Sequence, residues 1–153
     1  MIPSMPQKDL MTLGWREWVS LPELGLRSIK AKVDTGARTS TIHAFSVRTF
    51  EEGGRKRVEF LVHPFQKDTD TIVTCQADVL DRRVVSDSGG HKEERIIIET
   101  LLSIGDYAWP IEATLTARDT MLFRMLLGRT AIKGRAVVNP ARSFVVGKAP
   151  QES

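Results

Sequence analysis

Residues 29 to 37 read Ile-Lys-Ala-Lys-Val-Asp-Thr-Gly-Ala. The first five alternate between apolar and basic side chains, a period-two pattern typical of a strand with one buried face. Gly36 then allows the backbone to turn sharply and to approach another segment closely. The pattern predicts that Asp34 stands at the end of a rigid strand, next to the Thr35 hydroxyl. Because a rigid element positions a reactive group more accurately than a loop does, Asp34, Thr35 and Gly36 are the first candidates for a catalytic site.

A second stretch, about ninety residues further on, reads Met-Leu-Leu-Gly-Arg over residues 125 to 129. Asp-Thr-Gly alone is a common tripeptide, but the two stretches together resemble the aspartic proteases. In the retroviral-type (retropepsin) proteases, two apolar residues followed by Gly-Arg pack beneath the Asp-Thr-Gly turn and lead into a short helix. We therefore expect Leu127 and Gly128 to lie under Asp34, with a short helix over residues 129 to 133.

The rest of the chain predicts an all-β fold. Short apolar or alternating runs are separated by glycine, proline and polar residues, and there is little helical periodicity. Further strands are expected over residues 15–21, 26–33, 39–47, 47–50, 56–62, 71–78, 79–85, 94–104, 107–116, 123–127, 136–138 and 143–146. The architecture expected is a retropepsin-like closed barrel or sandwich with one short C-terminal helix. At 153 residues, the chain is expected to form a single domain over residues 13–147, with a flexible leader at 1–12 and a flexible tail at 148–153.

A closer resemblance covers residues 13 to 46 and 86 to 144. They resemble the bacterial RimB-like family, labelled ATP-dependent zinc proteases, whose members occur beside the RimK glutamate ligase. The matching stretches are residues 14–17, 30–44, 90–95, 109–112, 123–129 and 139–143. The resemblance implies a retropepsin-like fold. It also implies trimming of poly-glutamate tails on a small-subunit ribosomal protein, with the RimK-type ligase as a further partner.

Aspartic proteases need two facing carboxylates that share one proton, because two like charges at that distance do not both ionise. The chain offers one convincing Asp-Thr-Gly. Asp87-Ser88-Gly89 is a weaker candidate, since no apolar strand precedes it, and it is interpreted as a loop. A symmetric homodimer in which each chain contributes Asp34 is therefore the better hypothesis.

The net charge of +3 is unevenly distributed, because no acidic residue occurs between Asp119 and Glu152. If the Gly-Arg strand packs under Asp34, two basic stretches converge and favour an anionic partner. Retroviral proteases carry an acid at the position of Arg38; this departure puts the usual ion pair of Arg129 in doubt and suggests that Arg38 holds a substrate carboxylate. The substrate-binding candidates are Ala37, Arg38, His91, Lys92, Arg124 and Arg129.

Other chemistries find less support in the residues. The histidines and Cys75 lack zinc-ligand spacing, no phosphate-binding glycine loop is present, and no cofactor is expected. The single cysteine, the lack of a signal-peptide core and the lack of an apolar span predict a cytoplasmic protein. The basic region over residues 124–148 holds one aromatic side chain, Phe144, and base stacking needs several, so direct nucleic-acid binding is not favoured. Two alternatives to a peptidase stay open: a ribosome- or RNA-binding β domain without catalysis, and a regulator of the glutamate ligase.

Overall fold

The computed structural model describes residues 10–86, 89–117 and 122–149. The alternating stretch forms the strand β3 (Leu26–Asp34), as predicted. Ile29, Ala31 and Val33 are buried, whereas Lys32 is exposed to solvent. The period-two pattern therefore orients the strand, and it delivers Asp34 to the strand's carboxyl end.

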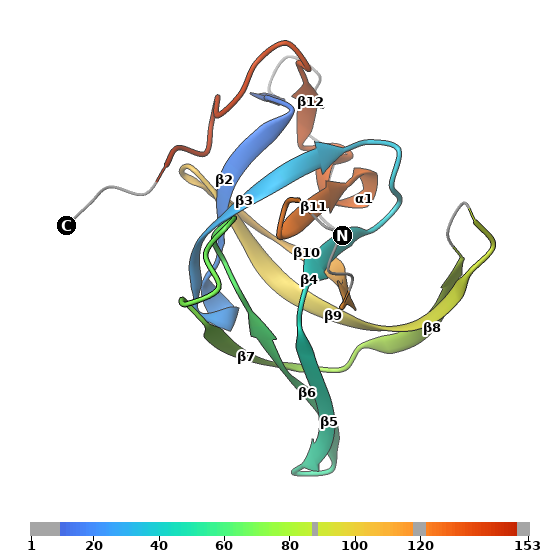
Figure 1. Cartoon of the computed structure of the whole chain (residues 1–153). Helices are drawn as coiled ribbons and strands as arrows, with labels where there is room; N and C mark the ends of the chain where they lie inside the picture. Colours follow the sequence, from blue (N-terminus) through green and yellow to red (C-terminus); the bar gives the residue numbers. More distant parts are fainter. Residues whose placement is uncertain (1–9, 87–88, 118–121, 150–153) are drawn as a thin grey trace.

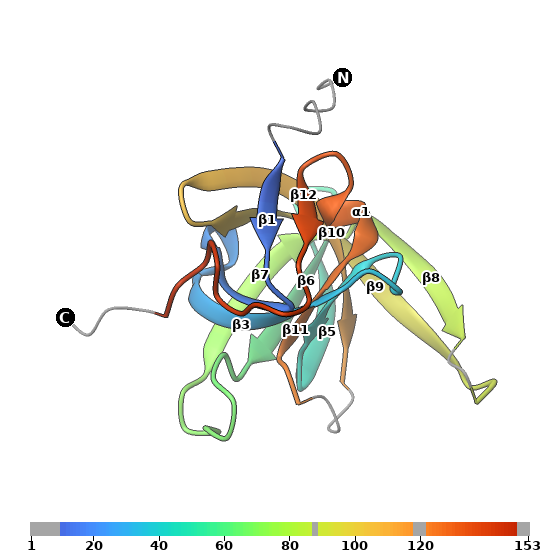
Figure 2. The same ribbon diagram turned by 90° about the horizontal axis from the view of Figure 1, so that it is seen from above.

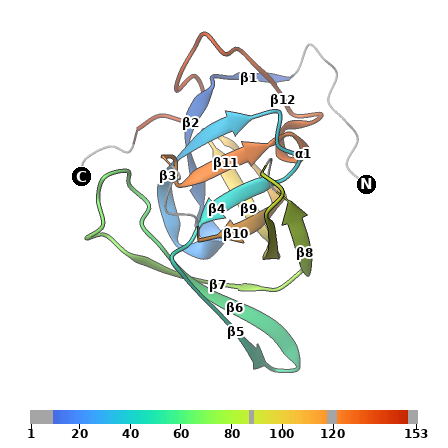
Figure 3. The same cartoon turned by 45° about the vertical axis from the view of Figure 1, so that its right-hand side comes forward.

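Six strands form the central structure (Figure 1). They are β2 (Arg16–Leu21), β3, β4 (Ser40–His43), β9 (Lys92–Ile104), β10 (Tyr107–Thr116) and β11 (Met125–Gly128). The order is β10-β4-β11-β3-β2-β9, and β10 also pairs with β9, so the pairings close into a ring. Figure 3 shows β3, β11, β4 and β10 side by side on one flank. The all-β expectation is confirmed.

The remaining strands surround this ring, and β8 extends away from it (Figure 2). β8 (Asp81–Ser86) continues the sheet beyond β9, and β1 (Met11–Leu13) pairs with β12 (Ala136–Val138). A separate three-stranded sheet contains β5 (Ser46–Glu52), β6 (Arg55–Val62) and β7 (Val73–Asp78). The helical elements are a 3-10 turn, η2 (Pro22–Leu24), and the helix α1 (Arg129–Ile132), which confirms the short helix expected near the C-terminus. None of the helices in the described ranges has the length and apolar character needed to cross a membrane.

The strand β1 lies partly inside the expected leader, since Met11 and Thr12 belong to it. Residues 1–9 lie outside the described part of the chain. The strand expected over 143–146 is wrong. The backbone N–H groups of Val145, Val146 and Gly147 do not bond to a neighbouring strand. They donate instead to the Glu17 carboxylate, which is fully buried. This carboxylate ties the C-terminal segment to β2.

The core is continuous across the ring. Its largest fully buried side chains include Leu26, Ile29, Ile42, Met125 and Leu127, which come from the strands around Asp34. Trp109 on β10 is also buried and donates its indole N–H to the carbonyl of Ala131, 2.9 Å away. This bond fixes α1 against the ring, so the helix that follows Gly128 has a defined position.

Candidate active site

The parallel pairing of β11 with β3 places Gly128 directly beside Asp34. Leu127 pairs with Val33 in the same register, and both are buried. The apolar-Gly-Arg segment therefore packs against the Asp-Thr-Gly turn, as the sequence predicts. Gly128 is required sterically, because a Cβ atom there would lie 2.6 Å from the carbonyl carbon of Thr39 and 2.9 Å from the backbone nitrogen of Ser40.

Hydrogen bonds fix the turn after Asp34. The N–H of Gly36 donates to Asp34 Oδ1 at 3.1 Å, and the N–H of Ala37 donates to the Asp34 carbonyl at 3.2 Å. From the other side, the N–H groups of Arg129 and Thr130 donate to the carbonyls of Ala37 and Arg38, at 2.8 and 3.1 Å. The turn is thus held at both ends by backbone groups, which is the arrangement that positions a carboxylate with little freedom.

Arg129 does not form the ion pair that the corresponding arginine makes in the retroviral enzymes. It makes a hydrogen bond to the backbone. Its Nη1 atom donates to the carbonyl of Gly36 at 3.3 Å. No carboxylate pairs with Arg129 among the residues that the structure describes. The basic residue at position 38 explains this, since the acid that would accept the guanidinium is missing. Arg129 therefore supports the turn through a backbone carbonyl.

Buried hydroxyl groups lie behind the turn. Ser40 is fully buried and its Oγ accepts the N–H of Gly128 at 3.1 Å. Thr41 and Thr114 share a hydrogen bond of 3.1 Å between their hydroxyls, which joins β4 to β10. Each hydroxyl thus satisfies a polar group that the ring would otherwise bury unpaired.

The Asp34 side chain is half-buried at the molecular surface, and Thr35 and Gly36 are exposed. Within the described ranges, no hydrogen bond joins Asp34 to another acidic side chain. The second candidate, Asp87, lies outside the described residues. A second carboxylate for Asp34 is therefore not provided by the described part of one chain.

Arg38 lies between two pockets. One has a volume of about 440 Å³ and is lined by Thr35, Arg38 and residues of α1, including Arg129. The other, of about 460 Å³, lies between the turn and the β8–β9 hairpin, and Ala37 lines it together with Arg38. Asp34 itself lines neither pocket. The Arg38 guanidinium has no hydrogen bond or ion pair within the described residues and is exposed.

Three of the expected substrate-binding residues line neither of these two pockets. Arg124 immediately precedes β11, and the last residue of β11, Gly128, lies beside Asp34. The length of the four-residue strand therefore separates Arg124 from Asp34 by about 13 Å. His91 and Lys92 lie where the β8–β9 hairpin turns back, and they line neither pocket. Ala37, Arg38 and Arg129 are the candidates that the fold gathers around Asp34.

The β8–β9 hairpin contributes pocket residues that the sequence did not indicate. Arg83 and Arg95 line the pocket that contains Arg38, as does Thr114 of β10. The available signal was the place of each arginine in an expected strand, over residues 79–85 and 94–104, in which every second residue shares a face by alternation. The register that sets Arg83 opposite Arg95 could not be obtained from that alternation, because a period shows the face of a strand and not its pairing.

The described part of the chain offers neither a metal site nor a reactive thiol. Within residues 10–86, 89–117 and 122–149, no three His, Cys, Asp or Glu side chains gather closely enough to hold a metal ion, so the donor set for a zinc ion is not present there. Cys75 is buried, and this burial raises the pKa of its thiol to about 12. A thiol that stays protonated at neutral pH is a poor nucleophile.

A strand ending in Asp-Thr-Gly, packed against an apolar-Gly-Arg strand in a sheet-rich ring, defines the retropepsin-like class. The model of the RimB-like family, described as "Retropepsin-like aspartic endopeptidase RimB", matches residues 12–149. The chain belongs to this family. The solved structure of Lpg0085, a protein of unknown function from Legionella pneumophila, has the same fold. Its TM-score is 0.74 at 24% identity, over 88% of this chain and 97% of that one.

Curated relatives carry the name "Probable alpha-L-glutamate ligase". The one from Desulfotalea psychrophila is 46% identical over 141 residues, which are 92% of this chain and 30% of the relative. The one from Shewanella halifaxensis is 44% identical over 136 residues, 89% of this chain and 30% of the relative. The chain thus spans about 30% of the length of the curated relatives it matches.

Proposed function

We propose that the chain is an aspartic-type peptidase in which Asp34 and the Asp34 of a second copy form the catalytic dyad. The observation that carries this proposal is the pairing of Gly128 with Asp34, which fixes the Asp-Thr-Gly turn on two strands of the ring. Membership of a family described as retropepsin-like aspartic endopeptidases supports it.

The proposed reaction is hydrolysis of a peptide bond by an activated water molecule. The ionised carboxylate of the dyad takes a proton from water while the protonated one donates a hydrogen bond to the substrate carbonyl. The resulting tetrahedral intermediate collapses when the carboxyl group that took the proton from water passes it to the amide nitrogen, which leaves as the amine. No covalent bond forms between enzyme and substrate, so the chain needs only to orient two carboxylates and one water.

The homodimer follows from the chemistry of the site. Asp34 is half-buried at the surface and has no acidic partner among the described residues, whereas the mechanism requires one. A two-fold axis beside Thr35 and Gly36 would bring two identical turns together and supply that partner. The exposure of both residues leaves this surface available.

The proposed substrate is a poly-glutamate tail on a small-subunit ribosomal protein in the cytoplasm. Three basic side chains near the turn, Arg38, Arg129 and Lys133, line one pocket, and no acidic residue is among its lining residues in the described part of the chain. An arginine binds a carboxylate through two parallel hydrogen bonds, and clustered positive charge attracts an anionic chain. The relatives named as glutamate ligases associate this domain with glutamate chemistry.

Those same relatives favour a second candidate, an accessory domain that controls a glutamate ligase. This chain accounts for about 30% of their length, so the rest of each relative has room for a separate ligase unit. In this second account the chain, when separate, binds the ligase and changes the length of the tail without cutting it. Ribosome or RNA binding without catalysis is a further outcome to distinguish.

Mass spectrometry of a glutamate-tailed ribosomal protein separates these functions. The substrate is incubated in EDTA with the wild-type protein or with the Asp34→Asn variant. Shortened tails with the wild type alone support a metal-independent aspartic peptidase. Equal shortening by both proteins excludes Asp34 as the catalyst. If neither shortens the tail, also after a repeat with zinc, the binding and regulatory functions are favoured.

A further inference from the structure

Two arginines face each other across the β8–β9 hairpin. Arg83 and Arg95 are direct partners in the antiparallel register. Directly opposite side chains in such a pair project from the same face, and like charges there destabilise the sheet. The two arginines therefore repel each other and each depends on a neighbouring carboxylate, in contrast to the Arg82–Glu94 ion pair on the other face.

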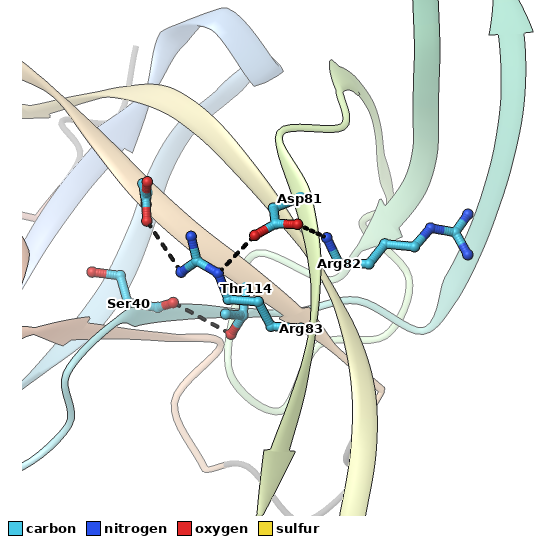
Figure 4. A network of polar contacts seen from close by, with 6 residues as sticks. Ser40, Asp81, Arg82, Arg83 and Thr114 are labelled. Atoms are coloured by element: carbon cyan, nitrogen blue, oxygen red, sulfur yellow. Dashed lines mark hydrogen bonds and ion pairs between the residues drawn. The ribbon is translucent and has the colours of Figure 1, made fainter.

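Carboxylates hold the two guanidinium groups in place, and Figure 4 shows the Arg83 guanidinium beside Asp81. Asp81 accepts the Nε–H of Arg83 at 3.0 Å, and Glu112 lies 3.5 Å from its Nη1. The backbone N–H of Arg82 and the Arg83 guanidinium lower the pKa of Asp81, so this support persists under mildly acidic conditions. Glu93 accepts the Nε–H of Arg95 at 3.2 Å, and neither Nη atom of Arg95 has a hydrogen bond among the described residues. The Arg95 guanidinium is thus oriented by Glu93, and its Nη–H groups remain available as hydrogen-bond donors to a ligand.

Both arginines line the pocket of about 460 Å³ that Arg38 also borders. Three arginines thus line one pocket, and none of its lining residues in the described part of the chain is acidic. The lining also includes the apolar residues Ala37, Val85 and Ile97. The volume falls within the range of roughly 300–1,000 Å³ typical of small-ligand sites. Positive groups beside an apolar wall match a short aliphatic stem that ends in a carboxylate.

We infer that this pocket is a specificity site that binds the side-chain carboxylate of a glutamate near the bond to be cut, through Arg38, Arg83 and Arg95. The stem of the glutamate packs on Ala37, Val85 and Ile97, and the carboxylate accepts hydrogen bonds from the guanidinium groups. This inference rests on the proposed function, and it adds the two hairpin arginines as the residues that select glutamate over its neutral isostere glutamine.

Binding of a fluorescein-labelled hexaglutamate peptide tests the site without relying on turnover. The affinity is measured in the Asp34→Asn background, with a hexaglutamine peptide as the matched ligand. We expect hexaglutamate to bind more tightly, and Arg83→Gln or Arg95→Gln to weaken its binding by roughly ten- to a hundredfold with little effect on hexaglutamine. Arg48→Gln, which removes an exposed arginine from an ion pair on β5, is the control and should change neither affinity. Arg83→Lys should retain part of the preference, and thermal unfolding confirms that each variant is folded.

Equal binding of the two peptides to the parent protein would overturn the inference. Folded Arg83→Gln and Arg95→Gln variants that bind hexaglutamate as tightly as the Arg48→Gln control would overturn it as well. If the wild-type protein binds hexaglutamate through these arginines but does not cut it, the glutamate-binding pocket is supported and the proposed peptidase activity is contradicted. The two proposals therefore fail separately.

Discussion

Gly128 lies beside Asp34 in the parallel pair of β11 and β3, and its Cα leaves no room for a side chain against the backbone of Thr39 and Ser40. The position of the candidate catalytic carboxylate thus depends on a residue far away in the sequence. The turn is anchored there by backbone bonds from Arg129 and Thr130, which any displacement of β11 would stretch.

The Gly128→Ala substitution should therefore lower both stability and activity. A Cβ atom 2.6 Å from a backbone carbonyl carbon forces β11 away from β4, at a cost of roughly 1–3 kcal/mol. Because the turn moves with β11, tail shortening by the folded fraction should also fall. Gly54→Ala is the control. Its Cβ atom would meet no atom within 4 Å, so only its left-handed backbone is strained, far from Asp34 in sequence. Equal activity of the two folded variants would contradict this account.

Glu17 should be a large contributor to stability. Its buried carboxylate accepts N–H groups from Gly14, Val145, Val146 and Gly147, at 2.6 to 2.9 Å. The Glu17→Ala substitution leaves these donors without an acceptor, which should reduce the free energy of unfolding by about 3 kcal/mol or more. Denaturant unfolding measures this loss, and limited proteolysis should show earlier cleavage after residue 142. For comparison, Glu59→Ala removes a partly exposed ion pair with Arg48 and should lower the free energy of unfolding far less than Glu17→Ala does.

Arg129 and Arg124 should differ in function although the sequence suggests both. Arg129 donates to the carbonyl of Gly36, so Arg129→Gln should reduce kcat/KM on a glutamate tail by roughly tenfold. Arg124 lies at the opposite end of β11, and Arg124→Gln should change kcat/KM by less than about twofold. Steady-state kinetics on folded variants decides this, and a larger effect at Arg124 would mean that substrate runs along β11.

Cys75 should make stability depend on alkaline pH. Burial raises the thiol pKa from 9.0 to about 12, so the unfolded chain loses this proton at a lower pH than the folded protein does. Stability from this group is therefore complete below pH 9.0 and declines above it, by up to about 1.4 kcal/mol per pH unit. Unfolding of the wild type and of Cys75→Ala, compared below pH 9.0 and about one unit above, isolates the effect. A difference between the two proteins that stays constant across this range would refute it.

The alternation of Ile29, Ala31 and Val33 was enough to predict β3 and the position of Asp34, because burial of one face requires that period. The Gly-Arg pattern likewise predicted the partner strand. The segment at 143–146 is apolar, yet it forms no strand. A single buried carboxylate, Glu17, takes up its N–H groups, and a local pattern cannot show such a long-range contact.

The same limit explains the candidate site. Arg38 and Arg129 could be predicted because both are adjacent in sequence to the motifs. Arg83 and Arg95 could not, because their meeting depends on the register of β8 against β9 and on the way that hairpin reaches the turn. Pairing across a sheet is decided by the whole fold.

The measurement that tests the central claim most directly is the titration of the Asp34→Asn variant into wild-type protein, with subunit exchange, while tail shortening is followed. If the dyad takes one Asp34 from each of two chains, mixed dimers are inactive, and activity follows the square of the wild-type fraction. An equal mixture should then retain about one quarter of the activity of the same total amount of wild type. Activity proportional to the wild-type fraction, about one half in that mixture, would show that each chain works alone and would contradict the shared dyad.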